Sequence, residues 1–228
     1  MVSIVCCTMR QHFLENVFQN YESQVCKEKE IIIILNQDDM DINKWEVRAK
    51  FSRGVSIYQL SEELTLGECL NFAMKKARYD FIAKFDDDDY YAPNYLIQSL
   101  EALKKMNADV VGKRTVYMYF EEEKTLVINR PGEENKFVKQ GLKGATLIFK
   151  KEISEKIKFP KLNIGEETFF IRQCIKNKYK VYSTNKNNYV CLRISGKSHH
   201  TWNASNSLLL KKSSIVCKTE DYKPFILD

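Results

Sequence analysis

Apolar runs alternate with amphipathic stretches through the first 106 residues of the chain. The strongest run is EIIIIL at residues 30–35, whose four consecutive isoleucines predict a strand buried on both faces. Three further short runs predict strands at residues 2–7, 55–60 and 80–85. Each predicted strand is followed by a helix-compatible stretch, and these lie at residues 13–24, 43–52 and 66–77 and from Pro93 onward.

Four such β-α units imply a largely parallel sheet covered by helices. Ligands of these sheets bind beyond the carboxyl ends of the strands. The polar turns at residues 8–10, 36–39 and 86–89 follow three of the predicted strands. We therefore expect these three turns to lie on one rim of the sheet.

The second half of the chain has a different pattern. Residues 115–120 and 125–130 are apolar runs split by the charged turn 121–124, which predicts an antiparallel hairpin. Further strands are expected at residues 144–149, 179–182 and 189–194, and a helix at 166–177. No low-complexity linker or internal repeat interrupts the chain, so we expect one α/β domain over residues 1–228.

Composition narrows the classes of protein. Hydrophobic residues make up 44% and charged residues 29% of the 228, which is ordinary for a globular domain. The net charge of +6 comes from scattered basic residues without a basic tract interleaved with aromatics, so no nucleic-acid partner is expected. No apolar stretch approaches the roughly 20 residues that span a bilayer, and we expect no transmembrane segment.

The chain has seven cysteines and no CxxC pair. Several of them lie inside apolar runs, where a reduced cysteine behaves as a small hydrophobic residue. This pattern favours a reducing compartment over a disulfide framework. Since no signal-peptide pattern opens the sequence, the expected location is cytoplasmic.

The run of four aspartates at residues 86–89 carries the clearest chemistry. Adjacent carboxylates repel one another, and a divalent cation such as Mg²⁺ or Mn²⁺ removes that repulsion. Such an ion takes one or two carboxylates and receives further oxygens from substrate phosphates. The alternative is a solvated acidic loop that leads into the next helix. A calcium loop of the helix-loop-helix kind is disfavoured, because its spacing and central glycine are missing.

Four segments in order, VSIVCCTMR, IIIILNQDD, LTLGECLNFAMKKARYDFIAKFDDDDYYAPNYL and IGEETFFIRQCIKNKYKVY, resemble family 2 glycosyltransferases with the GT-A fold. The resemblance covers about four-fifths of the chain. It implies a Rossmann-like, mainly parallel central sheet flanked by helices, with a smaller antiparallel β part in the second half. Residues 1–112 would bind the nucleotide-sugar, and residues 113–228, with the C-terminal tail, would bind the acceptor.

The resemblance also implies an activity. It predicts inverting transfer of a sugar from a nucleoside-diphosphate sugar, UDP- or dTDP-linked, to an unknown acceptor in polysaccharide or glycoconjugate synthesis. Asp86 and Asp88 align with the family's Asp-x-Asp element, whose last carboxylate holds Mn²⁺ or Mg²⁺ and whose first contacts the ribose or the metal shell. Asp87 and Asp89 leave the register open, so Asp87 is also a candidate donor contact.

Other donor contacts follow from the same resemblance. Thr8, and Asn36 or a neighbour, occupy the positions that cup the base and ribose, and Arg10 and Asp39 share their rim. Asn71 ends the family's GxxxxN stretch. The basic residue that often precedes that asparagine is replaced by Leu70, so a diphosphate contact is lost or taken over by Lys84.

Glu166 and Glu167 align with a Glu-Asp pair that opens the helix beneath the acceptor. The second acid of that pair is the general base, which makes Glu167 the expected base and Glu166 the alternate. A carboxylate there can take the proton of an attacking hydroxyl, and one base opposite the leaving group gives inversion. The alternative is that both acids only complement the amino end of their helix.

Three more residues complete the expected site. His200 is a candidate metal ligand, since neutral imidazole can complete a Mn²⁺ shell, although a surface histidine is the alternative. Trp202 is a candidate stacking surface for a sugar, or else packs the C-terminal tail. Arg172 could orient the acceptor or form a surface ion pair.

Two other functions stay open at this point. A metal-dependent nucleotidyltransferase would require a glycine-rich phosphate loop near the first strand, and no glycine precedes Gly54. A non-catalytic nucleotide-sugar-binding module would keep the fold without turnover, and the two acidic sites argue against it.

Overall fold

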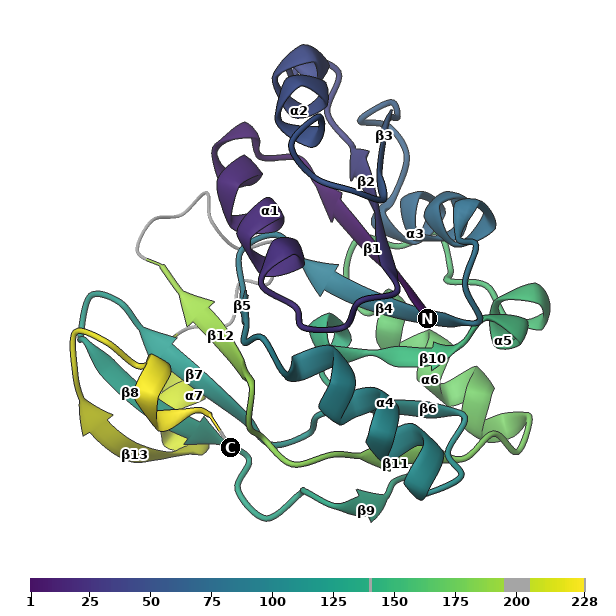
Figure 1. Cartoon of the computed structure of the whole chain (residues 1–228). Helices are drawn as coiled ribbons and strands as arrows, with labels where there is room; N and C mark the ends of the chain where they lie inside the picture. The colour runs from purple at the N-terminus through teal and green to yellow at the C-terminus, as the bar shows by residue number, and fades with distance from the viewer. Residues whose placement is uncertain (140, 195–205, 228) are drawn as a thin grey trace.

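A large sheet of eight strands forms the centre of the molecule (Figure 1). The computed structural model describes residues 1–139, 141–194 and 206–227. The strands lie in the order β3-β2-β1-β4-β10-β6-β11-β9. The first four in the sequence, which are mutually parallel, are β1 (Val2–Thr8), β2 (Lys29–Leu35), β3 (Val55–Gln59) and β4 (Phe81–Asp86).

The isoleucines of β2 show how the sheet is packed. Ile31 and Ile33 enter one core cluster, and Ile32 and Ile34 enter another on the opposite face, with all four at most 1% exposed. The first cluster is covered by α1 (Leu14–Glu22), α2 (Ile42–Ala49) and α4 (Tyr95–Lys105) (Figure 1). The second is covered by α3 (Leu66–Lys76), α5 (Lys151–Lys156) and α6 (Glu166–Lys176). The prediction of a parallel sheet between helices is confirmed.

The far part of this sheet is mixed. Its strands are β10 (Ile148–Lys150), β6 (Val110–Gly112), β11 (Val181–Ser183) and β9 (Lys136–Phe137), and β10 runs antiparallel to both β4 and β6. The expected strand at 144–149 is partly wrong, because Gly144–Thr146 forms a 3-10 turn. The Tyr91 hydroxyl donates a hydrogen bond to the Ala145 carbonyl, and the Tyr95 hydroxyl donates one to the Thr146 carbonyl. These bonds hold the backbone of the turn outside the strand ladder.

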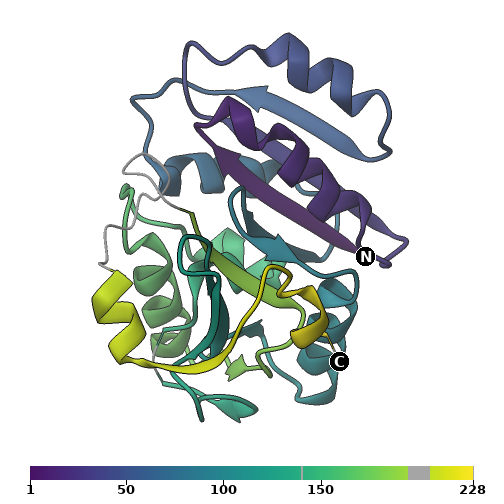
Figure 2. The same cartoon turned by 90° about the vertical axis from the view of Figure 1, so that its left-hand side faces the viewer.

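A second sheet of five strands lies beside the first, in the order β13-β8-β7-β12-β5. The predicted hairpin is β7 (Val116–Phe120) with β8 (Thr125–Asn129), and the two strands are antiparallel. Figure 2 shows the yellow C-terminal part beside these teal and green strands. The remaining members are β12 (Tyr189–Arg193), β5 (Tyr90–Tyr91) and β13 (Ser213–Lys218), the last preceded by α7 (Asn206–Lys211). The chain therefore passes from the large sheet to the small one directly after β4.

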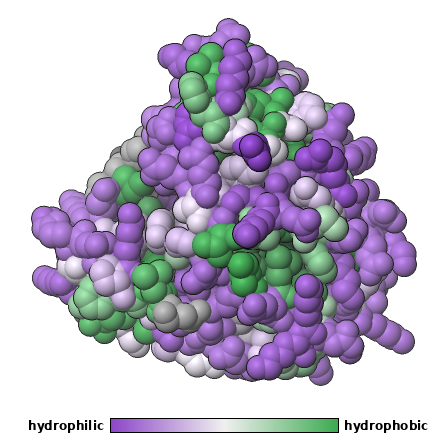
Figure 3. All heavy atoms as spheres, in the orientation of Figure 1, coloured by the Kyte–Doolittle hydropathy of each residue, from purple (hydrophilic) through white to green (hydrophobic). Residues whose placement is uncertain are grey.

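The visible surface is mostly hydrophilic, with an apolar patch at the top over α2 (Figure 3). Leu14, Val47 and Phe51 line a shallow hollow there, and Phe51 is 80% exposed. Within the described parts of the chain, no helix has the length and apolar character needed to cross a membrane.

Candidate active site

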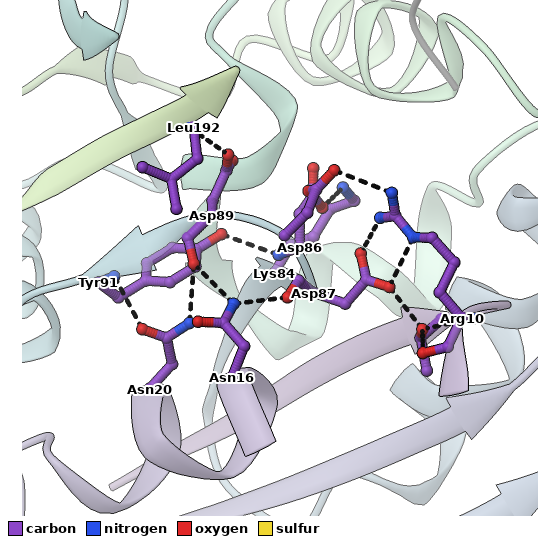
Figure 4. A network of polar contacts seen from close by, with 11 residues as sticks. Arg10, Asn16, Asn20, Lys84, Asp86, Asp87, Asp89, Tyr91 and Leu192 are labelled. Carbon is purple, nitrogen blue, oxygen red and sulfur yellow. Dashed lines mark hydrogen bonds and ion pairs between the residues drawn. The ribbon is translucent and has the colours of Figure 1, made fainter. Parts of the chain in front are cut away.

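Residues 86–89, here called the acidic turn, connect the two sheets. β4 ends at Asp86 and β5 begins at Tyr90. The amides of Asn16 and Asn20 on α1 donate to the backbone carbonyls of Asp87 and Asp89 at 2.6–3.1 Å and hold the turn against the helix (Figure 4). Since β1 pairs with β4, the turn after β1 comes to lie beside the acidic turn.

The acidic turn rests on an aromatic cluster. The rings of Phe85 and Tyr91 are stacked with centroids 3.7 Å apart, and Tyr95 packs edge-on against both. The Tyr91 hydroxyl accepts a hydrogen bond from the Asp86 backbone at 2.8 Å. The buried Tyr91 ring thereby holds the backbone of Asp86, the first residue of the turn.

Two of the four aspartates point into the protein. Asp87 and Asp89 are each 3% exposed. Asp87 accepts hydrogen bonds from the Thr8 hydroxyl at 2.5 Å and from the Nε and Nη2 groups on one edge of the Arg10 guanidinium (Figure 4). Asp89 accepts from the Tyr189 hydroxyl and from the Leu192 backbone at 3.2 Å. Both carboxylates therefore fasten the turn to neighbouring strands.

The other two aspartates are more exposed, and each pairs with a largely buried basic side chain. The side chain of Asp86 is 37% exposed and pairs with Lys84. Asp88 Oδ2 lies 3.1 Å from Arg10 Nη1, and its side chain is 12% exposed. Asp86 and Asp88 are therefore the two more exposed carboxylates of the turn, a distinction that four identical residues could not provide in the sequence.

Burial perturbs the carboxylates that point inward. It raises the pKa of Asp87 to about 6, with the charge of Asp88 adding to the shift and Arg10 opposing it. Burial and the charge of Asp88 likewise raise the pKa of Asp89 to about 7. Burial and the neighbouring carboxylate therefore both disfavour the charged forms of Asp87 and Asp89.

Three basic side chains supply the compensating charge. Burial alone would lower the pKa of Lys84, but Asp86 and Glu166 outweigh it and the pKa is raised. For half-buried Lys143, the opposing influences are burial, which lowers the pKa, and Cys191, Asp89 and Asp86, which together raise it. With Arg10, these lysines surround the acidic turn with positive charge, which suits a phosphate-bearing ligand.

The two-glutamate start of α6 is the second acidic group of the site. Gly165 takes a left-handed conformation (φ 82°) at the amino end of α6, so the chain turns sharply into the helix. Glu166 is 3% exposed, and burial raises its pKa to about 7 against the charge of Lys84. Glu167 is half-buried. Lys84 interacts electrostatically with Asp86, Glu166 and Glu167, so one cation is shared by both acidic groups.

Gly144 makes room for Glu167. A Cβ placed on Gly144 would lie 2.8 Å from Glu167 Cγ, closer than such atoms approach in proteins. The 3-10 turn that replaces the expected strand therefore lies directly against the candidate base. A side chain at position 144 would displace the Glu167 carboxylate.

The remaining predicted residues are less closely gathered. The Asn36 side-chain amide donates a hydrogen bond to the Ser61 carbonyl at 2.7 Å, and the Asn36 backbone N–H donates one to the Thr8 carbonyl. Asp39 is exposed. The Asn71 amide bonds both backbone groups of Phe159 at 2.8 and 3.0 Å, which braces α3. Arg172 is exposed on α6. His200 and Trp202 fall outside the described residues.

The acidic turn has a donor set that fits a hard divalent cation bound together with phosphate. Among the described residues, no group of three histidine, cysteine or acidic side chains is gathered as for an all-protein metal site. Mg²⁺ and Mn²⁺ need only one or two carboxylates when substrate phosphates supply other oxygens. Asp86 and Asp88, the two more exposed carboxylates of the turn, would be the ones to supply them.

Some site residues were missed in the sequence. Asn16 and Asn20 lie four residues apart on α1, and such a polar pair facing inward on an otherwise apolar helix side is a detectable signal. Lys143 and Tyr189 carry no local signal, because only the tertiary fold brings them to the acidic turn.

Comparisons with known proteins identify the fold. The chain is similar to residues 1–349 of S. aureus TarS in a crystal structure with UDP-GlcNAc, with a TM-score of 0.70 and 17% identity over 90% of this chain and 62% of that one. It is similar to mannosyltransferase PcManGT from Pyrobaculum calidifontis in complex with GDP-Man and Mn²⁺, with a TM-score of 0.60 and 16% identity over 87% of this chain and 58% of that one. The chain thus spans about three-fifths of the length of these proteins.

These likenesses show that the mixed sheet, with its smaller second sheet, is the GT-A fold. No curated protein matches the sequence. Residues 3–182 match the sequence model described as "Glycosyl transferase family 2", which covers the acidic turn and the start of α6. The chain therefore belongs to glycosyl transferase family 2.

Proposed function

We propose that the protein is an inverting glycosyltransferase that uses a nucleoside-diphosphate sugar and Mn²⁺ or Mg²⁺. The observation that carries this proposal is the pair of acidic groups, the acidic turn and the start of α6, which share Lys84. Support for the donor class comes from the similar structures, one determined with UDP-GlcNAc and the other with GDP-Man and Mn²⁺.

On the donor side, Asp86 and Asp88 would hold the metal, which when bound offsets negative charge on the departing diphosphate. Lys84 and Lys143 lie beside these carboxylates and add positive charge where the diphosphate oxygens would lie. The buried carboxylates of Asp87 and Asp89 keep the turn in position through Thr8 and Tyr189. In this proposal the anomeric carbon of the bound donor would lie toward α6.

On the acceptor side, Glu167 is the proposed general base. It is half-buried and so reachable, whereas Glu166 is buried against Lys84. Glu167 would take the proton of an acceptor hydroxyl while the hydroxyl oxygen bonds to the anomeric carbon. The bond from that carbon to the diphosphate oxygen breaks in the same step with its electron pair leaving on the diphosphate. One displacement from the opposite face inverts the anomeric configuration.

Calorimetric titration with UDP, dTDP or GDP, each with and without Mn²⁺, tests the donor half of the proposal. We expect one of these nucleotides to bind the wild-type protein more tightly with Mn²⁺, and Asp88→Ala to lose this metal-dependent gain. Asp41→Ala is the matched control, because Asp41 is an exposed aspartate that pairs with Lys44 on α2. An Asp88→Ala protein with wild-type Mn²⁺-dependent affinity would contradict the assignment.

A further inference from the structure

We propose that Arg10 acts as a built-in counter-ion of the acidic turn. In this proposal Arg10 leaves Asp88 when a divalent cation binds there and contacts the diphosphate instead. The inference rests on the proposed function, because it assigns a second partner to a residue of the same site. Metal and nucleotide would consequently bind cooperatively.

The guanidinium of Arg10 is held on one edge and on one face. Its Nε lies 3.1 Å from Asp87 Oδ2, and Nη2 bonds the other oxygen of Asp87 (Figure 4). The guanidinium carbon lies 4.6 Å from the centre of the Phe13 ring. Asp87 is itself fixed by the Thr8 hydroxyl. These contacts orient Arg10 independently of Asp88.

The contact with Asp88 is the outer one. Arg10 Nη1 lies 3.1 Å from Asp88 Oδ2, and Asp88 is the more exposed of the two carboxylates that Arg10 contacts. A cation that binds Asp88 would bring a second positive charge against the guanidinium, and the two repel each other. The Asp88 contact therefore competes with the metal, while the two bonds to Asp87 do not.

Release from Asp88 leaves Arg10 anchored by Asp87 with N–H groups directed toward the ligand side of the turn. A planar guanidinium matches the oxygens of a phosphate group well. A metal that arrives alone must break the Arg10–Asp88 pair without replacement. A metal that arrives with a diphosphate gives Arg10 a new anionic partner, so each ligand raises the affinity for the other by the same factor.

The test compares Mn²⁺ binding in the wild-type protein and in Arg10→Gln, with Mn²⁺ alone and then with saturating UDP or GDP. Free Mn²⁺ is followed by electron paramagnetic resonance. Arg10→Gln should bind Mn²⁺ alone about tenfold more tightly, since a charge-assisted pair no longer competes. The nucleotide should then raise the Mn²⁺ affinity of Arg10→Gln much less than that of the wild-type protein.

Arg48→Gln is the matched control. Arg48 also bridges two carboxylates, Glu15 and Glu22, and lies 4.4 Å from the centre of an aromatic ring, that of Phe18. This variant should behave as wild type in both titrations. If Arg10→Gln does not fold, Arg10→Lys decides instead: it keeps the charge that competes with Mn²⁺ and should bind Mn²⁺ alone about as wild type does, but without the planar fork the nucleotide should raise its Mn²⁺ affinity less.

Two results would overturn the inference, and they are distinguishable. If the wild-type protein shows Mn²⁺-dependent nucleotide binding but the Arg10 variants match it in both titrations, Arg10 is only a brace and the proposed function stands. If the wild-type protein shows no metal-dependent nucleotide binding, the proposed function fails and the inference fails with it.

Discussion

At the scale of single residues, Glu167 decides whether the chain is a catalyst or a binder. Glu167→Gln keeps the size and hydrogen bonding of the side chain but removes the proton acceptor. We expect kcat to fall by about 10²–10⁴-fold, with nucleoside-diphosphate affinity unchanged. If Glu167 only complements the amino end of α6, turnover stays normal and roughly 0.3–1 kcal/mol of stability is lost. Turnover and melting temperature of this variant and of Glu166→Gln separate the two cases.

Gly144 provides an independent way to move the same carboxylate. In Gly144→Val the new side chain would collide with Glu167, so turnover should fall at least about tenfold while nucleotide affinity is kept. Gly141→Ala is the control on the same loop, because a Cβ there meets nothing within 4 Å. Equal turnover of Gly144→Val and Gly141→Ala would show that Glu167 tolerates displacement.

The roles of single residues were only partly predictable. The sequence predicts chemistry at the acidic turn and at Glu166 and Glu167, because carboxylates after a strand or at a helix start are locally visible; that chemistry stays a prediction. It could not tell which aspartates point inward, since that depends on Thr8, Arg10 and Tyr189, which are distant in the chain. The roles of His200 and Trp202 stay predictions.

At the scale of elements, Tyr189 joins β12 to the acidic turn. Its hydroxyl donates to Asp89, and both residues are buried. Tyr189→Phe removes that donor and leaves a buried carboxylate oxygen with one bond fewer, which should cost about 1–3 kcal/mol of unfolding free energy. Chemical denaturation measures the loss. Stability equal to wild type would mean that the backbone of Leu192 alone holds Asp89.

Glu30 joins three elements and gives the fold an acid-sensitive point. It accepts hydrogen bonds from Ser3 on β1 at 2.6 Å and from Arg78, which follows α3, at 2.6 and 2.7 Å. Burial alone would raise the pKa of Glu30, but these bonds outweigh it and the pKa is lowered. The folded state therefore binds its proton less readily than the unfolded chain does.

The sign of the pH dependence follows from that lowered pKa. The stabilisation by Glu30 is fully present above its unfolded pKa of about 4.3 and is lost as the pH falls through the lower folded value. Glu30→Gln should therefore be less stable than wild type at pH 7, and the difference should shrink below about pH 4. Denaturation midpoints measured from pH 7 to pH 3 check this, and a constant difference would contradict it.

Element prediction succeeded where the pattern is local. Residues 30–35 form the β2 core because four isoleucines suit burial on both faces, and α3 follows its three-and-four spacing. The turn at Gly144–Thr146 and the edge strand β13 were not predicted. The turn depends on tyrosine hydroxyls from α4 and β5, and β13 pairs with β8, which lies some 85 residues earlier. Neither element can therefore be predicted from its own residues alone.

At the scale of the whole molecule, the chain passes back and forth between the two sheets. Residues after 112 contribute to both sheets, because β9, β10 and β11 lie in the large sheet while β7, β8 and β12 lie in the small one. The division into a nucleotide half and an acceptor half at residue 112 stays a prediction about ligands. The expectation of a reducing, cytoplasmic location likewise stays a prediction.

The cysteines report on the integrity of this packing. Cys6, Cys69, Cys174 and Cys191 are buried, whereas Cys26 and Cys217 are partly exposed. Burial also raises the pKa of the Cys7 thiol, which lowers its reactivity. With a thiol reagent at pH 8, Cys26 and Cys217 should react first, and all seven should react in denaturant. Fewer than seven in fresh protein would indicate a disulfide, and rapid reaction of all seven in buffer would indicate a loose core.

The alternation of the acidic turn has a consequence for how this site can change in evolution. Loss of any one of the four aspartate codons yields the same three-aspartate protein, because the residues are identical. β4 and β5 fix the two ends of the turn, so the shortened chain has to give up either one of the two more exposed carboxylates or an anchoring one. A point substitution can remove an exposed or an anchoring carboxylate separately. A codon deletion always gives the same three-aspartate turn, which lacks one of the two kinds of carboxylate contact.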